Sequence, residues 1–276
     1  MKVFLAGHRG SKKILKASSY LVKKYLPVQF EINYLNYGTY NYKNLHGCQY
    51  INLGNFRKGG VDSWSSYLYK TFQNIDDEFI IFSLDDYFLS KNLNIENFNT
   101  LHKALKNNTN FVSAELSISP EEKYNKKFSS SDIYVYQNNY SFTVNTQWRI
   151  WKREFLLEIL KNTSNPWSFE IEGSKYLNNS NCFSISHCSD VLNYPEISSL
   201  SNRNKNKISV LGNQEEDISD LIKLGYLKLN QLVLGQWKIG TPKYTDFKNN
   251  QFKILDLIKD EDEKRFYKLM LDKCLI

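Results

Sequence analysis

The sequence lacks the features that indicate disulfide bonds, a membrane-spanning segment or a signal peptide. Its four cysteines, Cys48, Cys182, Cys188 and Cys274, lack the regular spacing of a disulfide framework. It has no run of about 18 apolar residues that would span a membrane, and no signal peptide precedes the first strand-like run. We therefore expect reduced thiols and a cytoplasmic location, and peripheral contact with the inner face of the membrane stays open.

Glycine and proline are also scarce, at 12 and 5 residues, and the chain has neither an internal repeat nor a long low-complexity segment. Nothing in this composition marks a flexible linker between domains. With 41% hydrophobic and 15% aromatic residues, a chain of this length can bury a substantial core. We expect one domain over residues 1–240 and a C-terminal helical extension over residues 241–276.

The charge balance is basic, because 36 lysines and arginines against 29 aspartates and glutamates give a net charge of +7. A positive charge suits an anionic partner such as a nucleotide diphosphate, an acidic glycan or a lipid head group. The lysines are scattered, and no zinc-finger, helix-turn-helix or RNA-binding motif accompanies them. We therefore do not expect nucleic acid as a partner.

Hydrophobic periodicity predicts an α/β fold with a mostly parallel central sheet flanked by helices. The apolar run from Phe79 to Leu84 is nearly continuous, which is typical of a central strand covered by helices on both faces. Strands and helices alternate up to about residue 120. We expect strands at residues 2–6, 28–34, 50–53, 79–84, 111–116, 133–136 and 182–186, and helices at 14–25, 61–75, 95–105 and 152–161.

Three residues close in sequence, Cys182, His187 and Cys188, carry atoms that bind zinc. Their Cys-x5-Cys spacing matches no common zinc motif, and the sequence shows no fourth ligand. We favour their interpretation as small buried side chains.

Two adjacent acids, Asp85 and Asp86, follow the apolar strand. Ligands of open α/β sheets bind at the carboxyl ends of the strands, so the acids have the position of a binding site. A divalent cation bridging to a diphosphate would relieve the repulsion between them, and carboxylate oxygens are the hard ligands that such ions prefer. The alternative is a solvated turn, where Asp is common.

The segment from Ser63 through Phe88, with its Leu-Asp-Asp-Tyr-Phe end, resembles the aspartate motif of GT-A glycosyltransferases. Residues 145–156 and 165–170 are similar to the acceptor-side segment of bacterial and viral polysaccharide glycosyltransferases. The resemblance covers roughly residues 1–190 and lies in motifs rather than in continuous sequence. It implies the nucleotide-diphospho-sugar transferase fold and transfer of a sugar from a nucleotide-diphosphate sugar to a hydroxyl of a glycan or lipid-linked acceptor.

The resemblance also implies roles for single residues. Asp86 would bind Mn2+ or Mg2+, and Asp85 would assist the metal or hold the donor. A histidine late in the domain would complete the metal site, and His187 is the candidate. Leu-Asp-Asp departs from the Asp-x-Asp pattern, so the requirement for metal stays open. The remaining donor-side candidates are Gly7, His8, Arg9 and Trp64.

An acceptor hydroxyl must lose a proton as it attacks, so an inverting enzyme needs a carboxylate on the acceptor side. Glu170 is our candidate for this general base, with Glu172 and Asp190 as competitors. The structural alternative is an acid that opens a helix, where negative charge is favourable. Trp148, Trp151 and Trp167 have faces that suit sugar C–H surfaces as well as a core.

Two other functions stay open at this stage. A sugar nucleotidyltransferase would open with a glycine-rich basic loop, and residues 7–13 resemble such a loop only faintly. A carbohydrate- or nucleotide-binding protein without catalysis would also account for the tryptophans and the basic charge.

Overall fold

The computed structural model describes residues 1–7, 14–36, 42, 45–54, 64–117, 124–128, 132–136, 142–194, 208–209, 215–227 and 232–233. The chain divides into two units. The first, called the sheet unit, comprises Met1–Arg9, Leu26–Asp85 and Lys91–Asn193, and the second comprises Gly10–Tyr25, Asp86–Ser90 and Tyr194–Ile276. The predicted boundary at residue 240 and the predicted terminal helices lie outside the described residues.

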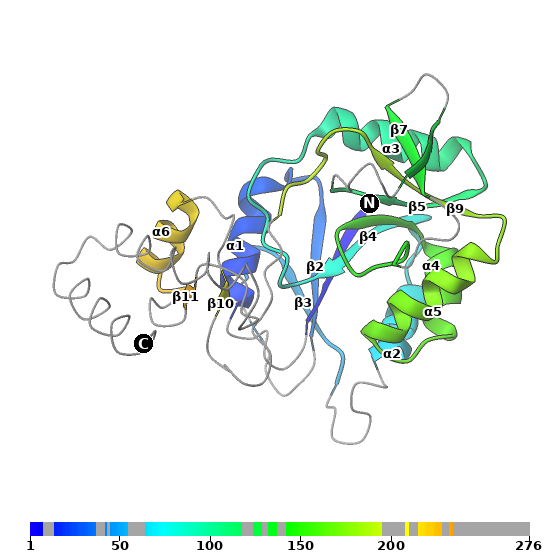
Figure 1. Ribbon diagram of the computed structural model, residues 1–276. Helices are drawn as coiled ribbons and strands as arrows, with labels where there is room; N and C mark the ends of the chain where they lie inside the picture. The colour runs from blue at the N-terminus through cyan, green and yellow to red at the C-terminus, as the bar shows by residue number, and fades with distance from the viewer. Residues whose placement is uncertain are drawn as a thin grey trace, which may run out of the picture. The chain divides into compact units, whose positions relative to one another are not determined.

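The sheet unit is built on nine strands in the order β3-β2-β1-β4-β8-β5-β9-β7-β6 (Figure 1). The strands β8 and β7 run antiparallel to both of their neighbours, and the other seven share one direction. The predicted α/β class with a mostly parallel sheet is therefore confirmed. The strands are β1 Lys2–Ala6, β2 Glu31–Asn36, β3 Gln49–Asn52, β4 Phe79–Leu84, β5 Phe111–Glu115, β6 Tyr124–Lys127, β7 Ile133–Tyr136, β8 Arg149–Lys152 and β9 Phe183–His187.

Helices cover both faces of this sheet. The helices α2 (Trp64–Gln73), α4 (Arg153–Lys161) and α5 (Pro166–Asn178) pack together over one face, where Phe82 of β4 lies against Phe72 and Phe169. Phe79, an odd number of positions from Phe82, points to the opposite face and contacts His102 of α3 (Ile95–Asn107). The continuous apolar run of β4 follows from this burial on both sides.

The second unit contains α1 (Leu15–Tyr25), α6 (Glu215–Lys223) and the short parallel pair β10 (Ile208–Ser209) and β11 (Leu232–Val233). The carboxylate of Asp217, on α6, is fully buried and accepts hydrogen bonds of 2.6 Å from both Lys24 and Tyr25 at the end of α1. Burial, followed by the bond to Asp217, raises the pKa of Tyr25 to about 12. This cluster fastens α6 to α1.

Within the part of the chain that the structure describes, no helix combines the length and apolarity needed to cross a membrane.

Candidate functional site at the carboxyl edge of the sheet

The carboxyl ends of β1, β2, β3 and β4 meet at one edge of the sheet because these four neighbouring strands are parallel. The backbone hydrogen bonds between neighbouring strands continue one residue past the ends of β1 and β4. The N–H of Gly7 donates to the carbonyl of Leu35 at 2.8 Å, and the N–H of Asp85 donates to the carbonyl of Ala6 at 3.0 Å. The backbone therefore fixes Gly7 and Asp85 side by side at this edge.

The side chain of Asp85 occupies the space that a side chain on Gly7 would fill. A Cβ atom added at Gly7 would lie 2.1 Å from Oδ2 of Asp85 and 3.0 Å from Nδ2 of Asn36, at the end of β2. Both Asp85 and Asn36 are 2% exposed. A glycine is therefore needed at position 7, because any side chain there would clash with Asp85. The Asp85 carboxylate and the Asn36 amide lie together in the space that the missing side chain leaves.

A pair of tyrosines lies near this carboxylate. The rings of Tyr42 and Tyr50, the latter on β3, meet edge to face with centroids 5.4 Å apart. Burial raises the pKa of Tyr50, and the charges of Tyr42 and Asp85 raise it further. The Tyr50 phenol is therefore protonated at neutral pH and can donate a hydrogen bond.

Asp86 is half-buried and lies in the turn that follows β4. Two consecutive carboxylates supply the hard oxygen atoms that Mg2+ and Mn2+ prefer, and the first of them lies in the space that Gly7 leaves. The acid pair therefore fits the metal that the resemblance implies. The other predicted donor residues of this edge, His8 and Arg9, lie outside the described residues.

Glu170 lies on α5, whose start is fixed by a capping box. The side chain of Asn165 accepts from the N–H of Ser168 at 2.9 Å, and the Ser168 hydroxyl accepts from the N–H of Asn165 at 2.9 Å. Pro166 occupies the first helical position, and the first turn contains no acid. Glu170 therefore lies past the first turn of the helix. An acid within the first turn would be explained by its interaction with the helix dipole, and this explanation does not apply to Glu170.

The carboxylate of Glu170 reaches back to the loop before β8. Its Oε1 accepts from the N–H of Thr146 at 3.0 Å and from the Thr146 hydroxyl at 2.9 Å. The carbonyl of Thr146 in turn accepts from the N–H of Leu84 at 3.2 Å. Because Leu84 directly precedes Asp85, the structure brings Glu170 to the same edge of the sheet as Asp85, with Thr146 as the one residue between Glu170 and Leu84 in the chain of hydrogen bonds.

The competing acids have other surroundings. Glu172 is exposed and forms an ion pair of 2.9 Å with Lys175 one turn along α5. Asp190 is also exposed, and its backbone carbonyl accepts from the side chain of Asn97. Glu170 is thus the predicted base that the described contacts connect to β4.

His187 does not reach the acid pair. It ends β9, which is separated from β4 by β8 and β5, so three strand spacings, roughly 14 Å, lie between them. Metal ligands lie within about 2.6 Å of their ion. The structure therefore does not bring the predicted metal ligand His187 beside Asp85 at the end of β4.

Most of the tryptophans singled out in the sequence belong to the core. Trp64 is 5% exposed and packs against Phe82 and Phe169, so a contact with the donor remains a prediction. Trp148 and Trp151 are fully buried. Trp167 is 67% exposed at the start of α5.

A buried ion pair at this part of the sheet was not predicted from the sequence. Arg149, which begins β8, is fully buried and donates to Glu115 at the end of β5 at 3.0 Å. The same guanidinium donates to the hydroxyls of Ser113 and Ser184. The sequence feature that could have predicted this ion pair is Arg149 itself. A charged residue within the apolar segment from Trp148 to Trp151 needs a buried partner of opposite charge.

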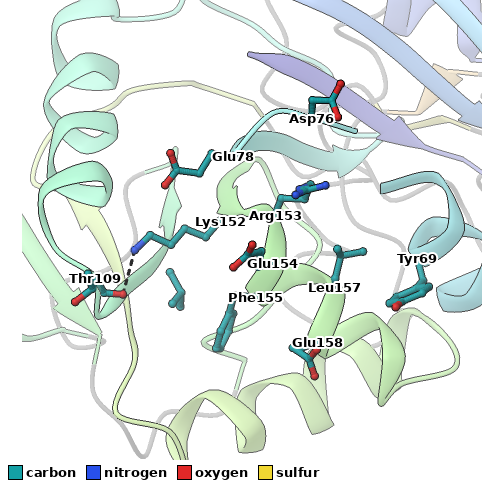
Figure 2. Close-up of a pocket in the computed structure, with 11 residues that line it drawn as sticks. Tyr69, Asp76, Glu78, Thr109, Lys152, Arg153, Glu154, Phe155, Leu157 and Glu158 are labelled. Carbon is teal, nitrogen blue, oxygen red and sulfur yellow. Dashed lines mark hydrogen bonds between the residues drawn. The ribbon is translucent and has the colours of Figure 1, made fainter. Parts of the chain in front are cut away.

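A hollow of about 770 Å3 opens at the other edge of the sheet (Figure 2). Glu78, which lines it, directly precedes β4, so the hollow lies at the amino end of the strand whose carboxyl end leads to Asp85. Figure 2 shows Lys152 reaching toward Thr109, whose carbonyl accepts its hydrogen bond at 3.0 Å. The hollow is therefore separate from the candidate site.

No protein-family model and no curated protein sequence matches this chain. Among solved structures, the TarS fragment 1–349 of S. aureus is similar at 12% identity and a TM-score of 0.46, over 81% of this chain and 64% of that one. An apo UDP-glucose pyrophosphorylase is similar at 11% identity and a TM-score of 0.42, over 70% and 90%. CMP:2-keto-3-deoxy-manno-octonic acid synthetase complexed with CTP follows at 12% and 0.41, over 69% and 90%.

Proposed function

We propose that this chain is a glycosyltransferase that moves a sugar from a nucleotide-diphosphate sugar to a hydroxyl of a glycan or lipid-linked acceptor. The observation that carries the proposal is the connection from Glu170 through Thr146 to Leu84, because it joins a candidate base to the strand that ends in Asp85. The aspartate motif and the acceptor-side motif that the sequence resembles are thus joined at one edge of the sheet.

On the donor side, Asp85 and Asn36, whose side chains meet beside Gly7, would hold polar groups of the nucleotide sugar. Asp86 would hold Mn2+ or Mg2+, an ion that, when bound, neutralises the charge of the departing diphosphate. The Tyr50 phenol, kept protonated by its raised pKa, is a further hydrogen-bond donor of this edge.

On the acceptor side, Glu170 would take the proton of the attacking hydroxyl. The acceptor oxygen forms a bond to the anomeric carbon, the bond from that carbon to the diphosphate oxygen breaks, and the proton passes to the carboxylate. Attack opposite the leaving group inverts the configuration. The two hydrogen bonds from Thr146 hold Oε1 in place, and Oε2 accepts no bond from the described residues, so it can receive the proton.

The first test is thermal unfolding of the protein with UDP, GDP, CDP and their sugars, each with and without Mn2+. A ligand at a hundred times its dissociation constant adds about 2.7 kcal/mol to the free energy of unfolding, which raises Tm by several degrees. We expect a shift with one nucleotide family that is larger with metal. Asp86→Asn should remove the part that depends on metal, and Asp76→Asn, which changes an exposed aspartate at the other edge, should keep it.

Product analysis then separates the proposal from its alternatives. A glycosyltransferase releases a nucleoside diphosphate from the sugar donor. A sugar nucleotidyltransferase would instead release pyrophosphate from a nucleoside triphosphate and a sugar phosphate. Binding without turnover of any donor would favour the binding protein, and no shift with any nucleotide would contradict the nucleotide site itself.

A further inference from the structure

His187, removed from the acid pair by the width of three strands, lies in another group of metal-binding side chains. One ligand atom each from Asp132, His187 and Cys188 lies within 4.8 Å of the other two. Asp132 directly precedes β7 and Cys188 directly follows β9, so two residues far apart in the sequence meet at one end of this strand pair. Cys182, the other cysteine near β9, does not take part.

The strand pairing fixes this arrangement. Ile133 pairs with His187 in the antiparallel ladder of β7 and β9, and the N–H of Cys188 donates to the carbonyl of Asp132 at 2.8 Å. The backbone therefore holds the first and last members of the group together before any ion is considered. A cluster formed only by mobile surface side chains would lack this constraint.

The ring of His187 is oriented by its own turn. Its Nδ1 accepts from the N–H of Ser189 at 3.0 Å, and the backbone oxygen of the same residue lies 3.2 Å from Nδ1. When Nε2 binds an ion, Nδ1 carries the ring proton and can donate a hydrogen bond to the Ser189 carbonyl, as metal-binding histidines commonly do. Within the described part of the chain Nε2 has no hydrogen-bond partner, and the residue is 6% exposed.

We propose that Asp132, His187 and Cys188 form a binding site for a divalent transition metal of the zinc class, separate from the Mg2+ or Mn2+ site of the acid pair. Thiolate and imidazole ligands select zinc and cobalt over magnesium and manganese. A tetrahedral zinc ion with bonds of about 2.0–2.3 Å keeps its ligands roughly 3.3–3.8 Å apart, so the ligand atoms need to approach one another by at most about 1–1.5 Å. Asp132 is exposed, which leaves a fourth position for water.

The site would fasten the end of β9 to the start of β7. The Cys188 thiol gives up its proton to solvent when it binds, because the thiolate is the form that binds metal. The inference is independent of the proposed sugar transfer, because it uses none of the residues of the acid pair or of Glu170.

The test is a titration with Co2+ of the full chain, with its thiols reduced, followed by absorption spectroscopy and by competition with Zn2+. We expect one saturating site with a thiolate-to-cobalt charge-transfer band, which Zn2+ abolishes and Mg2+ does not. Cys188→Ser should remove the band. Asp132→Asn should weaken binding by more than the roughly 10–100-fold that loss of an outer-shell partner costs.

Cys182→Ser is the matched control. Cys182 and Cys188 flank the same strand and are both partly exposed, but they lie roughly 20 Å apart along it. The control variant should keep the band and the affinity of the parent protein. Circular dichroism of each variant checks that it folds. The two cysteines are changed in preference to His187 because they are partly exposed, so their replacement disturbs the fold less. Absence of saturable Co2+ binding, or an unchanged band in Cys188→Ser, would overturn the proposal.

Discussion

At the scale of single residues, the candidate site depends on one missing side chain. Gly7 leaves the volume in which Oδ2 of Asp85 lies, and a methyl group there would approach it to 2.1 Å. We predict that Gly7→Ala lowers the free energy of unfolding by about 1–3 kcal/mol, the usual cost of overpacking a filled site. It should also reduce the Tm shift produced by the nucleotide donor, since the carboxylate must move.

A double variant separates this steric cause from a general defect. Asp85→Ala removes the atoms that the new methyl group meets, so adding Gly7→Ala to it should cost much less than adding it to the parent protein. Urea unfolding of the four proteins gives the interaction energy. Strictly additive effects would show that the carboxylate does not occupy the space beside Gly7.

The second prediction at this scale concerns Glu170. A glutamine there keeps an oxygen that can accept the two hydrogen bonds from Thr146, but it cannot take up a proton. We expect Glu170→Gln to lower kcat by roughly a hundredfold or more, with the donor-induced Tm shift unchanged.

Glu172→Gln is the matched control for Glu170→Gln, because it makes the same change on an exposed part of the same helix. Its turnover should stay near that of the parent protein. If Glu172→Gln loses activity and Glu170→Gln does not, the base has been assigned to the wrong acid.

The sequence was most informative about residues whose chemistry a motif requires. Asp85 and Glu170 were named from their acidic side chains, and the structure brings them to one edge. Asn36 and Arg149 were missed because their roles come from contacts across the sheet, with Gly7 in one case and Glu115 in the other. Spacing along the chain carries no information about such partners.

At the scale of elements, the bounds of some strands were predictable to the residue. The apolar runs at 79–84 and 133–136 have the bounds of β4 and β7. The four-residue strand β8 was missed, because it begins with Arg149 and its alternation is interrupted by that charge. The charge is tolerated there only through the ion pair with Glu115, which the sequence of β8 alone does not show.

The helix α3 carries a prediction for pH dependence. His102 contacts Phe79 and Phe98, and burial lowers its pKa from the usual 6.5, with the charge of Lys106 acting in the same direction. The unfolded chain therefore takes up the proton at a higher pH than the folded protein. The contribution of the neutral imidazole to stability is present above about pH 6.5 and is lost as the pH falls through the lowered value.

Replacement of His102 by Leu should remove this dependence. We expect the free energy of unfolding of the parent protein to fall between pH 7 and pH 5 by more than that of His102→Leu, as measured by urea unfolding at each pH. A His102→Leu protein whose stability falls as steeply as the parent's would show that other groups cause the acid sensitivity.

At the scale of the whole molecule, the candidate site arises from topology. Residues near positions 7, 36 and 85 meet because β1, β2 and β4 are parallel neighbours, and a site spread along the chain becomes one edge of the sheet. The class of fold followed from the sequence because burial determines hydrophobic periodicity. The order of the strands did not, since each strand's choice of neighbour depends on contacts distant in sequence.

The net charge gives the last prediction. An excess of seven positive charges attracts the chain to anionic surfaces, and the Debye length falls from about 30 Å at 0.01 M salt to about 8 Å at 0.15 M. If the acceptor is presented at a membrane face, the protein should sediment with vesicles that contain phosphatidylglycerol at low salt and be released as salt is added. Vesicles of phosphatidylcholine alone provide the control. Equal binding to both vesicles, or binding to neither, would contradict a membrane-facing acceptor and would leave the soluble glycan as the acceptor of the proposed transfer.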